Sequence, residues 1–174
     1  MGTSISFTFA PQRAGKLERA VQAATRHYPL PVTLNGAPMP RADFLDAARL
    51  VAKREGYRIG VFQNAYLQHS DTINFHGLTL RHPLPVVKEV HHTQWSVKVD
   101  IVDAPDLVLV LPARKEIFRG CALDRLIELC REAIFSVIRQ QPFHRLSFED
   151  WRLAQTSDPK FPEAARELPP WVQV

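Results

Sequence analysis

The chain has 174 residues, of which 45% are apolar and 23% are charged, and its formal net charge is +4. This length supports one domain with a substantial core and disfavours a second full-sized domain. No apolar run approaches the ~20 residues that are needed to cross a bilayer, and residues 1–9 lack the charged start and long apolar segment of a signal peptide. We therefore expect a cytoplasmic protein without a membrane partner.

The first half of the chain predicts short strands interleaved with helices. The pattern of apolar residues predicts a strand over residues 3–9, a helix over 16–27, a strand over 31–34, a short helix over 43–55 and strands over 57–63 and 72–81. Asn35-Gly36 is the strongest hairpin-type turn signal in the chain. Gly60, inside a predicted strand, indicates a bulge or a close approach of other atoms.

The centre of the chain carries two apolar runs joined by a turn. Residues 95–102 alternate between apolar and polar side chains, which predicts a strand with one buried face. Residues 107–111 are all apolar, which is typical of a short strand covered on both faces. Pro105 and the aspartates around it predict a turn between the two runs. Residues 83–92 contain two prolines and are expected to lie extended along the sheet edge.

A long helical pattern runs from about residue 116 to residue 141. Its apolar residues recur at three- and four-residue steps, so a wide stripe is expected to pack on a sheet face. From Pro142 onward prolines interrupt the sequence, and a helical turn is expected near Phe148 and Trp151. The predicted fold is therefore an α/β (α+β) domain over residues 1–141, with a mixed sheet, helices packed on one face and a long C-terminal helix. Residues 142–174 form a Pro-rich extension that wraps the surface or serves a partner.

Motifs of metal binding and catalysis are missing from the sequence. The seven histidines show no metal-ligand spacing, and no CxxC pair supports a zinc site. Cys121 and Cys130 lie on one predicted helix, too far apart for a disulfide, and are expected to be buried. No GxSxG, P-loop, paired-carboxylate or Cys–His arrangement stands out, so an enzyme complete in itself is not expected.

Arg114 and Lys115 stand where the second apolar run ends and the long helical pattern begins. Two cations at a strand-to-helix junction are well placed to meet an anion, because the free N–H groups at a helix start add to their field. The alternative is that they are solvated or pair with Glu116 and Asp106. Both alternatives remain open from spacing alone.

Two segments resemble the transducer (middle) domain of the GHKL ATPases, the superfamily of ninety-kilodalton heat-shock chaperones, gyrase B subunits, MutL proteins and sensor histidine kinases. Residues 2–7, GTSISF, resemble the G-T-x-[VIL]-x-F strand that closes a GHKL nucleotide-binding domain. Residues 106–116, DLVLVLPARKE, are similar to the acidic-Leu-Pro-Leu-Asn-Val-Ser-Arg-Glu segment that precedes a long helix in the heat-shock chaperones. Arg114 falls where that family has its Arg.

The resemblance implies a transducer-like module rather than a complete ATPase. In the family this Arg reaches the γ-phosphate of ATP held by the neighbouring domain, so Arg114, with Lys115, becomes a candidate phosphate contact. The family's Asn-bearing helix, which holds Mg²⁺, and its D-x-G-x-G segment, which holds adenine, are not found here. No cofactor is therefore expected in this chain; ATP and Mg²⁺ would be bound by a GHKL nucleotide-binding domain or subunit as partner. Lys115 departs from the family, which has an acidic residue there, and a homodimer is left open.

Two other functions compete with this reading. The net charge permits a nucleic-acid-binding domain, although the basic residues are scattered and no basic stripe is interleaved with aromatics. A protein-interaction domain with an unknown client is the other alternative. A steep loss of affinity with salt would favour nucleic acid.

Overall fold

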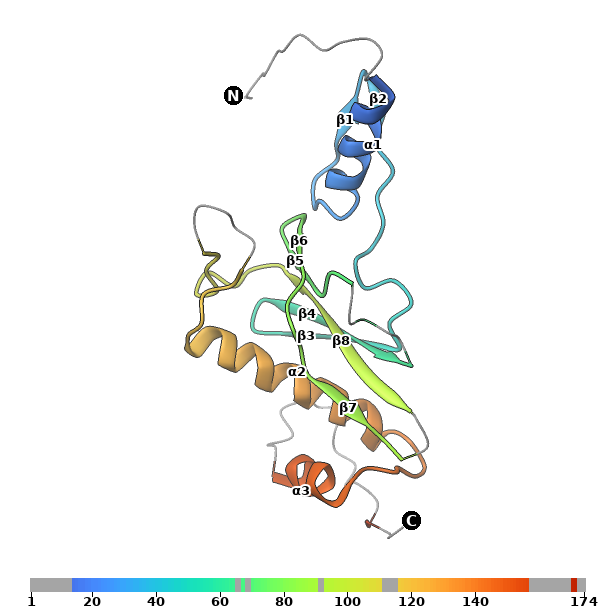
Figure 1. The fold of residues 1–174 in the computed structure, drawn as a ribbon, viewed down its shortest axis with the longest axis vertical. Helices are drawn as coiled ribbons and strands as arrows, with labels where there is room; N and C mark the ends of the chain where they lie inside the picture. Colours follow the sequence, from blue (N-terminus) through green and yellow to red (C-terminus); the bar gives the residue numbers. More distant parts are fainter. Residues whose placement is uncertain are drawn as a thin grey trace.

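The structure is a computed structural model that describes residues 14–64, 67, 70–90, 93–110, 116–156 and 170–171 (Figure 1). Within these residues it has a mixed α+β fold with a six-stranded sheet, a separate two-stranded hairpin and three helices. This confirms the predicted fold class. The strand expected over residues 3–9 lies outside the described residues. None of the described helices is long and apolar enough to cross a membrane.

The sheet is built around one long strand. Its strands are β3 (Leu50–Arg54), β4 (Tyr57–Gln63), β5 (Ile73–Phe75), β6 (Leu78–Leu80), β7 (Val86–Lys88) and β8 (Gln94–Ile101). The order is β3-β4-β8-β5-β6, and β7 also pairs with β8. One edge of β8 pairs antiparallel with β4. Along the other edge, β7 pairs antiparallel with the beginning of β8, and β5 pairs parallel with its end. The predicted strand over residues 95–102 is thus the centre of the fold.

The register of β4 and β8 separates an apolar face from a polar face. Ile59 lies opposite Val99 and Val61 opposite Val97, and all four are fully buried or nearly so. The intervening residues place Arg58 beside Asp100 on the other face. Side chains alternate across a strand, so the charged residues Arg58, Lys98 and Asp100 share the face away from this apolar cluster, together with Phe62.

The apolar face is covered by α2 (Cys121–Arg139), as the helical stripe predicts. Leu126, Ile134 and Ile138 of α2 are fully buried against the sheet's apolar residues. Farther from the sheet lies α3 (Phe148–Thr156), whose Ala154 belongs to the same core (Figure 1). The Arg139 guanidinium donates to the Ala154 carbonyl. The described part of the C-terminal segment therefore packs onto the domain.

A small N-terminal lobe, residues 14–42, stands beyond the other end of the sheet (Figure 1). It consists of α1 (Ala14–Thr25) and the hairpin β1 (Thr33–Leu34) with β2 (Ala37–Pro38). Asn35 and Gly36 connect the two strands with φ of 51° and 81°. Positive φ at both central residues is the signature of the type I′ turn that Asn-Gly favours, so this prediction is confirmed.

Two predictions in the first half are wrong. Residues 43–55 do not form a helix: a turn with Ala47 at φ 64° leads into β3, whose Ala52 faces the core. Helical spacing and strand alternation are hard to separate over so short a run. Residues 72–81 form β5 and β6 rather than one strand, because His76 and Gly77 turn the chain with φ of 50° and 96°.

The second apolar run also differs from its prediction. Residues 107–110 contain only an isolated bridge, Leu109 to Ile117, instead of a strand. Leu107 is buried, but Val108 is 55% exposed and Val110 is 42% exposed, so the run is not covered on both faces. An unbroken run of apolar residues therefore did not distinguish a buried strand from a loop of which only Leu107 is buried.

Three smaller predictions concern Gly60, the extended segment before β8 and the burial of the two cysteines. Gly60 is a site of close approach, since a Cβ there would lie 3.1 Å from both Ala48 Cβ and Leu45 Cδ2. β7 confirms an extended segment beside the sheet before β8. Of the two cysteines, Cys130 is buried as expected, whereas Cys121 is exposed at the start of α2.

Candidate functional site

The predicted phosphate-contacting residues, Arg114 and Lys115, lie outside the described residues. The described residues on either side of them are paired: the Val110 N–H donates to the Glu116 carbonyl at 2.9 Å, and the Phe118 N–H donates to the Val108 carbonyl at 2.8 Å. Val110 and Glu116, the last described residue before Arg114 and the first after Lys115, are therefore joined by a direct backbone hydrogen bond.

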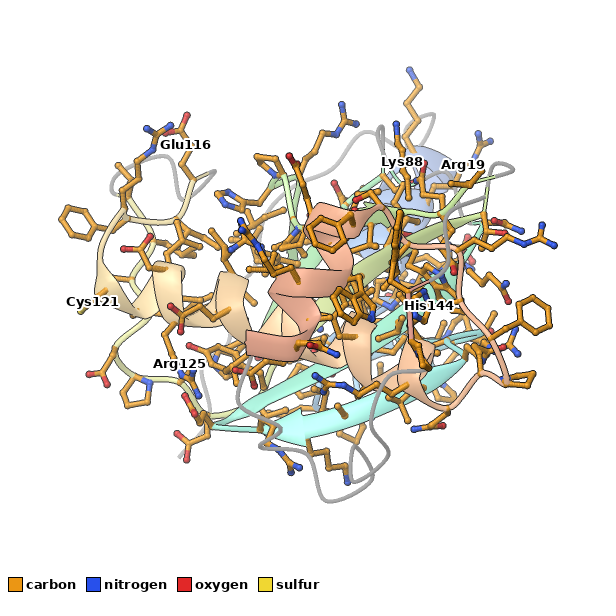
Figure 2. All side chains as sticks on the ribbon, turned by 90° about the horizontal axis from the view of Figure 1, so that it is seen from below. Arg19, Lys88, Glu116, Cys121, Arg125 and His144 are labelled. Carbon is orange, nitrogen blue, oxygen red and sulfur yellow. The ribbon has the colours of Figure 1, made fainter. Side chains whose placement is uncertain are left out.

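The helix start is not directly next to these cations in sequence. α2 begins at Cys121, after Gly120, rather than at Glu116. Glu116 and Cys121 nevertheless lie at the same end of the molecule, far from His144 (Figure 2). The free N–H groups at the start of α2 therefore lie on the same side of the molecule as Glu116. The prediction that the helix begins directly after Arg114 and Lys115 is wrong.

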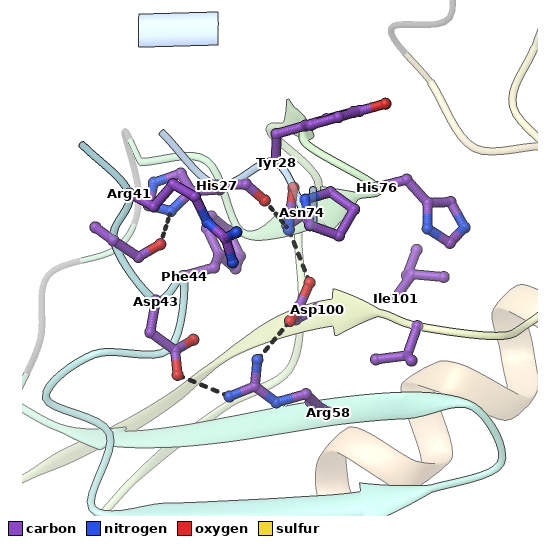
Figure 3. Close-up of a pocket in the computed structure, with 13 residues that line it drawn as sticks. His27, Tyr28, Arg41, Asp43, Phe44, Arg58, Asn74, His76, Asp100 and Ile101 are labelled. Atoms are coloured by element: carbon purple, nitrogen blue, oxygen red, sulfur yellow. Dashed lines mark hydrogen bonds and ion pairs between the residues drawn. The ribbon is translucent and has the colours of Figure 1, made fainter. Parts of the chain in front are cut away.

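A second candidate site is a polar cleft between the N-terminal lobe and the polar face of the sheet (Figure 3). The hollow measures about 520 Å³, and its walls include His27, Arg58, Asn74, His76 and Asp100. The side chains at its base form one connected network of hydrogen bonds and ion pairs.

Arg58 on β4 is the centre of this network. One guanidinium nitrogen lies 2.7 Å from Asp43 Oδ2 and the other lies 2.7 Å from Asp100 Oδ2. The Asp100 side chain is 15% exposed and that of Asp43 is 50% exposed, so the pair with Asp100 is the more sheltered. The hydrogen bond from Arg58 holds the pKa of Asp43 below its ordinary value, although burial opposes the shift. The same bond raises the pKa of Arg58.

Asn74 on β5 extends the network to the lobe. Its register places it opposite Asp100, and its amide nitrogen donates to Asp100 Oδ1 at 2.7 Å and to the His27 carbonyl at 3.3 Å. Its amide oxygen accepts the Gly77 N–H at 2.9 Å. Because Asn74 is only 3% exposed, these bonds satisfy a polar side chain that would be costly to bury alone.

The end of α1 is clamped to the segment that enters the sheet. The Ala42 N–H donates to the Arg26 carbonyl at 2.8 Å, and His27 Nδ1 donates to the Ala42 carbonyl at 2.9 Å. The His27 ring meets the Phe44 ring edge-on at 5.1 Å, and Phe44 is buried. The lobe is therefore tied to the sheet by backbone, side-chain and aromatic contacts together.

The hydrogen bonds and ion pairs of the polar cleft hold its side chains in place and do not favour proton transfer by its two carboxylates. Both carboxylates of the cleft are engaged by Arg58, and a general base needs a lone pair directed at a substrate proton. Among the described residues no group of three His, Cys, Asp or Glu side chains is placed to hold a metal ion. The contacts of the cleft form a fixed link between two parts of the chain.

Sequence reasoning missed this cleft. The alternation of residues 95–102 does place Asp100 on the polar side of its strand, which was one usable signal. The positions of Arg58 and Asn74 beside it depend on which strands neighbour β8 and in what register. That pairing is a long-range property that no local pattern in the sequence carries.

Comparisons with protein-family models, with curated proteins and with solved structures found no match to this chain.

Proposed function

We propose that this chain is a non-catalytic, transducer-like module of a GHKL-type ATP-binding protein. In this role it supplies a cationic loop, with Arg114 and Lys115, toward a phosphate held by a partner nucleotide-binding domain or subunit. ATP and Mg²⁺ belong to that partner, and the module works in the cytoplasm.

The observation that carries the proposal is the anchoring of the segment that bears the two cations. Leu107, two residues before the bridge, and Ile117, which forms the bridge with Leu109, are 2% and 4% exposed and belong to the core. The bridge at Leu109 ties the two ends together. A segment fixed at both ends to a packed core can present a cation reproducibly, which electrostatic stabilisation requires.

The polar cleft supports the coupling part of the role. The N-terminal lobe contacts the sheet through Asn74, which bonds both the His27 carbonyl and Asp100 on the central strand. Arg58 links Asp100 to Asp43, in the segment that directly follows the lobe. A displacement of the lobe would therefore act on β8. Such a network of directed contacts between two bodies is suited to carrying a conformational change.

A cation at this place has a clear chemical purpose. Charge on the transferring phosphoryl oxygens is stabilised by an Arg supplied from outside the nucleotide site, which in other systems accelerates phosphoryl transfer by about 10³ to 10⁵. The alternative functions, a nucleic-acid-binding or a protein-interaction domain, do not use the anchored loop in this specific way.

The experiment compares this chain alone with the product of its gene including any coding sequence upstream. We expect the upstream sequence to encode an Asn-bearing helix and a D-x-G-x-G segment, and the joined protein to hydrolyse ATP while this chain alone does not. An upstream sequence without these features, together with salt-sensitive binding of an oligonucleotide to the loop region, would favour the nucleic-acid alternative.

A further inference from the structure

Three arginines line a second hollow, on the lobe rather than on the sheet. This arginine groove, of about 400 Å³, lies between α1 and the segment that follows β2. Its walls include Arg19, Gln22, Ala23, Arg26, Arg41 and Ala42. The three arginines are exposed, whereas the groove's remaining walls are uncharged: Gln22, Ala23, Pro40 and Ala42.

The fold brings these arginines together by two devices. Arg19 lies in the middle of α1 and Arg26 follows its last residue, Thr25, seven residues later. A separation of about two helical turns places the two side chains on one side. Arg41 arrives from a different segment, and the hydrogen bond from the Ala42 N–H to the Arg26 carbonyl, 2.8 Å, fixes that segment beside Arg26. The convergence is therefore built by tertiary contacts as well as by helix geometry.

The groove has positive charge without acidic compensation. No Asp or Glu is among the described residues that line it. Within the part of the chain that the structure describes, none of the three arginine side chains forms a hydrogen bond or ion pair. Residues 1–13, which precede α1, contain no Asp or Glu and end in Arg13. Like charges held near one another repel, and a bound anion relieves that repulsion.

We propose that the arginine groove binds a small phosphate-bearing molecule. A guanidinium forms forked, charge-assisted hydrogen bonds with phosphate oxygens, and three guanidinium groups match the multiple charge of a phosphomonoester or pyrophosphate better than the single charge of a carboxylate. Its volume falls in the range of about 300–1,000 Å³ that is usual for small-molecule sites. The cations surround one hollow, whereas a nucleic-acid surface needs an extended track of charge.

The neighbouring polar cleft gives the rest of such a ligand a place. Arg41 and Ala42 line both hollows, so the two are contiguous. The Nε2 atom of His27 lies on the side of the ring away from the Ala42 carbonyl, and Asn74 and His76 also line the cleft. The ligand class is therefore a phosphorylated metabolite with a polar remainder.

This site goes beyond the proposed function. It is formed by the lobe, whereas the cations at residues 114 and 115 belong to the segment between Val110 and Glu116. Loss of phosphate binding at the groove would leave the transducer proposal intact, and an upstream sequence without a nucleotide-binding domain would leave the groove intact.

The test is calorimetric titration of the full chain with inorganic pyrophosphate. The groove variant replaces all three arginines: Arg19→Gln, Arg26→Gln and Arg41→Gln. The matched control removes the same charge from exposed positions outside the groove: Lys53→Gln, Lys88→Gln and Arg131→Gln. Circular dichroism melts check that each variant is folded, and the three single groove variants replace the triple variant if it is not.

We expect the wild type and the control to bind pyrophosphate with one site, and each single groove variant to bind at least about tenfold more weakly, as the loss of a charge-assisted hydrogen bond implies. Arg41→Lys keeps the charge without the fork and should fall between wild type and Arg41→Gln. Equal weakening in the control variant, or no binding by the wild type, would overturn the proposal. The proposal would also be overturned if the chain bound a single-stranded oligonucleotide through the three arginines but did not bind pyrophosphate.

Discussion

At the scale of single residues, Arg58 holds the polar cleft together. It is the side chain that contacts both the loop after the lobe, through Asp43, and the central strand, through Asp100. Asn74 then bonds Asp100 and the His27 carbonyl. A partly buried ion pair such as Arg58–Asp100 adds little to the free energy of unfolding by itself, but removing one partner leaves the other charge poorly solvated.

Replacement of Arg58 should therefore destabilise the protein more than an ordinary surface change. We expect Arg58→Met to lower the free energy of unfolding by about 1–3 kcal/mol, measured by urea denaturation. Lys53→Met is the control, because Lys53 is the exposed register partner of Arg58 on β3. Equal losses in the two variants would show that the bridge to Asp100 contributes nothing specific.

Asp43 makes part of the stability depend on pH. Its pKa lies below the ordinary 3.8 in the folded chain because Arg58 donates to it, so the folded state binds its proton less readily than the unfolded state. The contribution is present above about pH 4 and is lost as the pH falls through the lower, folded pKa. We expect Asp43→Asn to remove this part of the acid-induced loss in urea melts between pH 6 and pH 2.5, roughly. An unchanged pH slope in the variant would contradict the bond.

Residue-level prediction from the sequence succeeded where local chemistry decided the outcome. Asn35-Gly36 forms its turn because few other residues accept positive φ. The polar side of β8 follows from alternation, but the bonds of Asp100 do not, since their partners come from β4 and β5. The arginine groove was likewise invisible, because Arg41 reaches it only through the fold.

At the scale of elements, the turn between β3 and β4 is locked to the end of β8. The Gly56 carbonyl accepts the N–H groups of Val102 and Asp103, each at 2.9 Å. A Cβ on Gly56 would lie 1.7 Å from the Asp103 carbonyl oxygen, and its φ is +83°. This backbone-to-backbone contact leaves no room for a side chain.

A pair of glycine substitutions separates the contact from the backbone conformation. Gly36 has a similar φ of +81° but nothing within 4 Å of its would-be Cβ. We expect Gly36→Ala to cost about 1 kcal/mol from positive φ alone. Gly56→Ala should cost about 2 kcal/mol or more beyond that, from the clash. Equal costs in denaturant melts would mean that the turn at Gly56 does not contact the Asp103 backbone as described.

The long helix provides the main test of the core. Ile134 on α2 is fully buried in the cluster with the sheet, whereas Arg131, three residues before it, is exposed. Ile134→Asp should lower the free energy of unfolding by about 3 kcal/mol or more, because it buries an unpaired charge. Arg131→Gln should change it by less than about 0.5 kcal/mol. A soluble Ile134→Asp variant with an unchanged melt would remove α2 from the core.

Elements with a long, consistent period were predictable, and short ambiguous ones were not. α2 and β8 show their periods over many residues, so their packing partners could be anticipated. The run at residues 43–55 has apolar residues that fit helix and strand templates alike, and pairing with β4 decides for β3. Residues 107–110 of the second apolar run have no strand neighbour within the described part of the chain, so apolar composition alone gave the wrong prediction there.

At the scale of the whole molecule, the described residues form a lobe, a sheet and a helical layer along one axis (Figure 1). The polar cleft joins the first two, and the core joins the last two. The anchored bridge at Leu109 and Ile117 lies between β8 and α2 in the sequence.

The most direct measurement of the proposed function is the rate of ATP hydrolysis by the joined protein that the proposal predicts, carrying Arg114→Ala. We expect kcat to fall by about 10³-fold with little change in KM, because an Arg that acts on the transferring phosphoryl group stabilises mainly the transition state. Lys88→Ala, at an exposed position on β7, is the control and should keep the full rate. An unchanged kcat in Arg114→Ala, or hydrolysis by this chain alone at the rate of the joined protein, would contradict the assignment of a transducer-like, non-catalytic role.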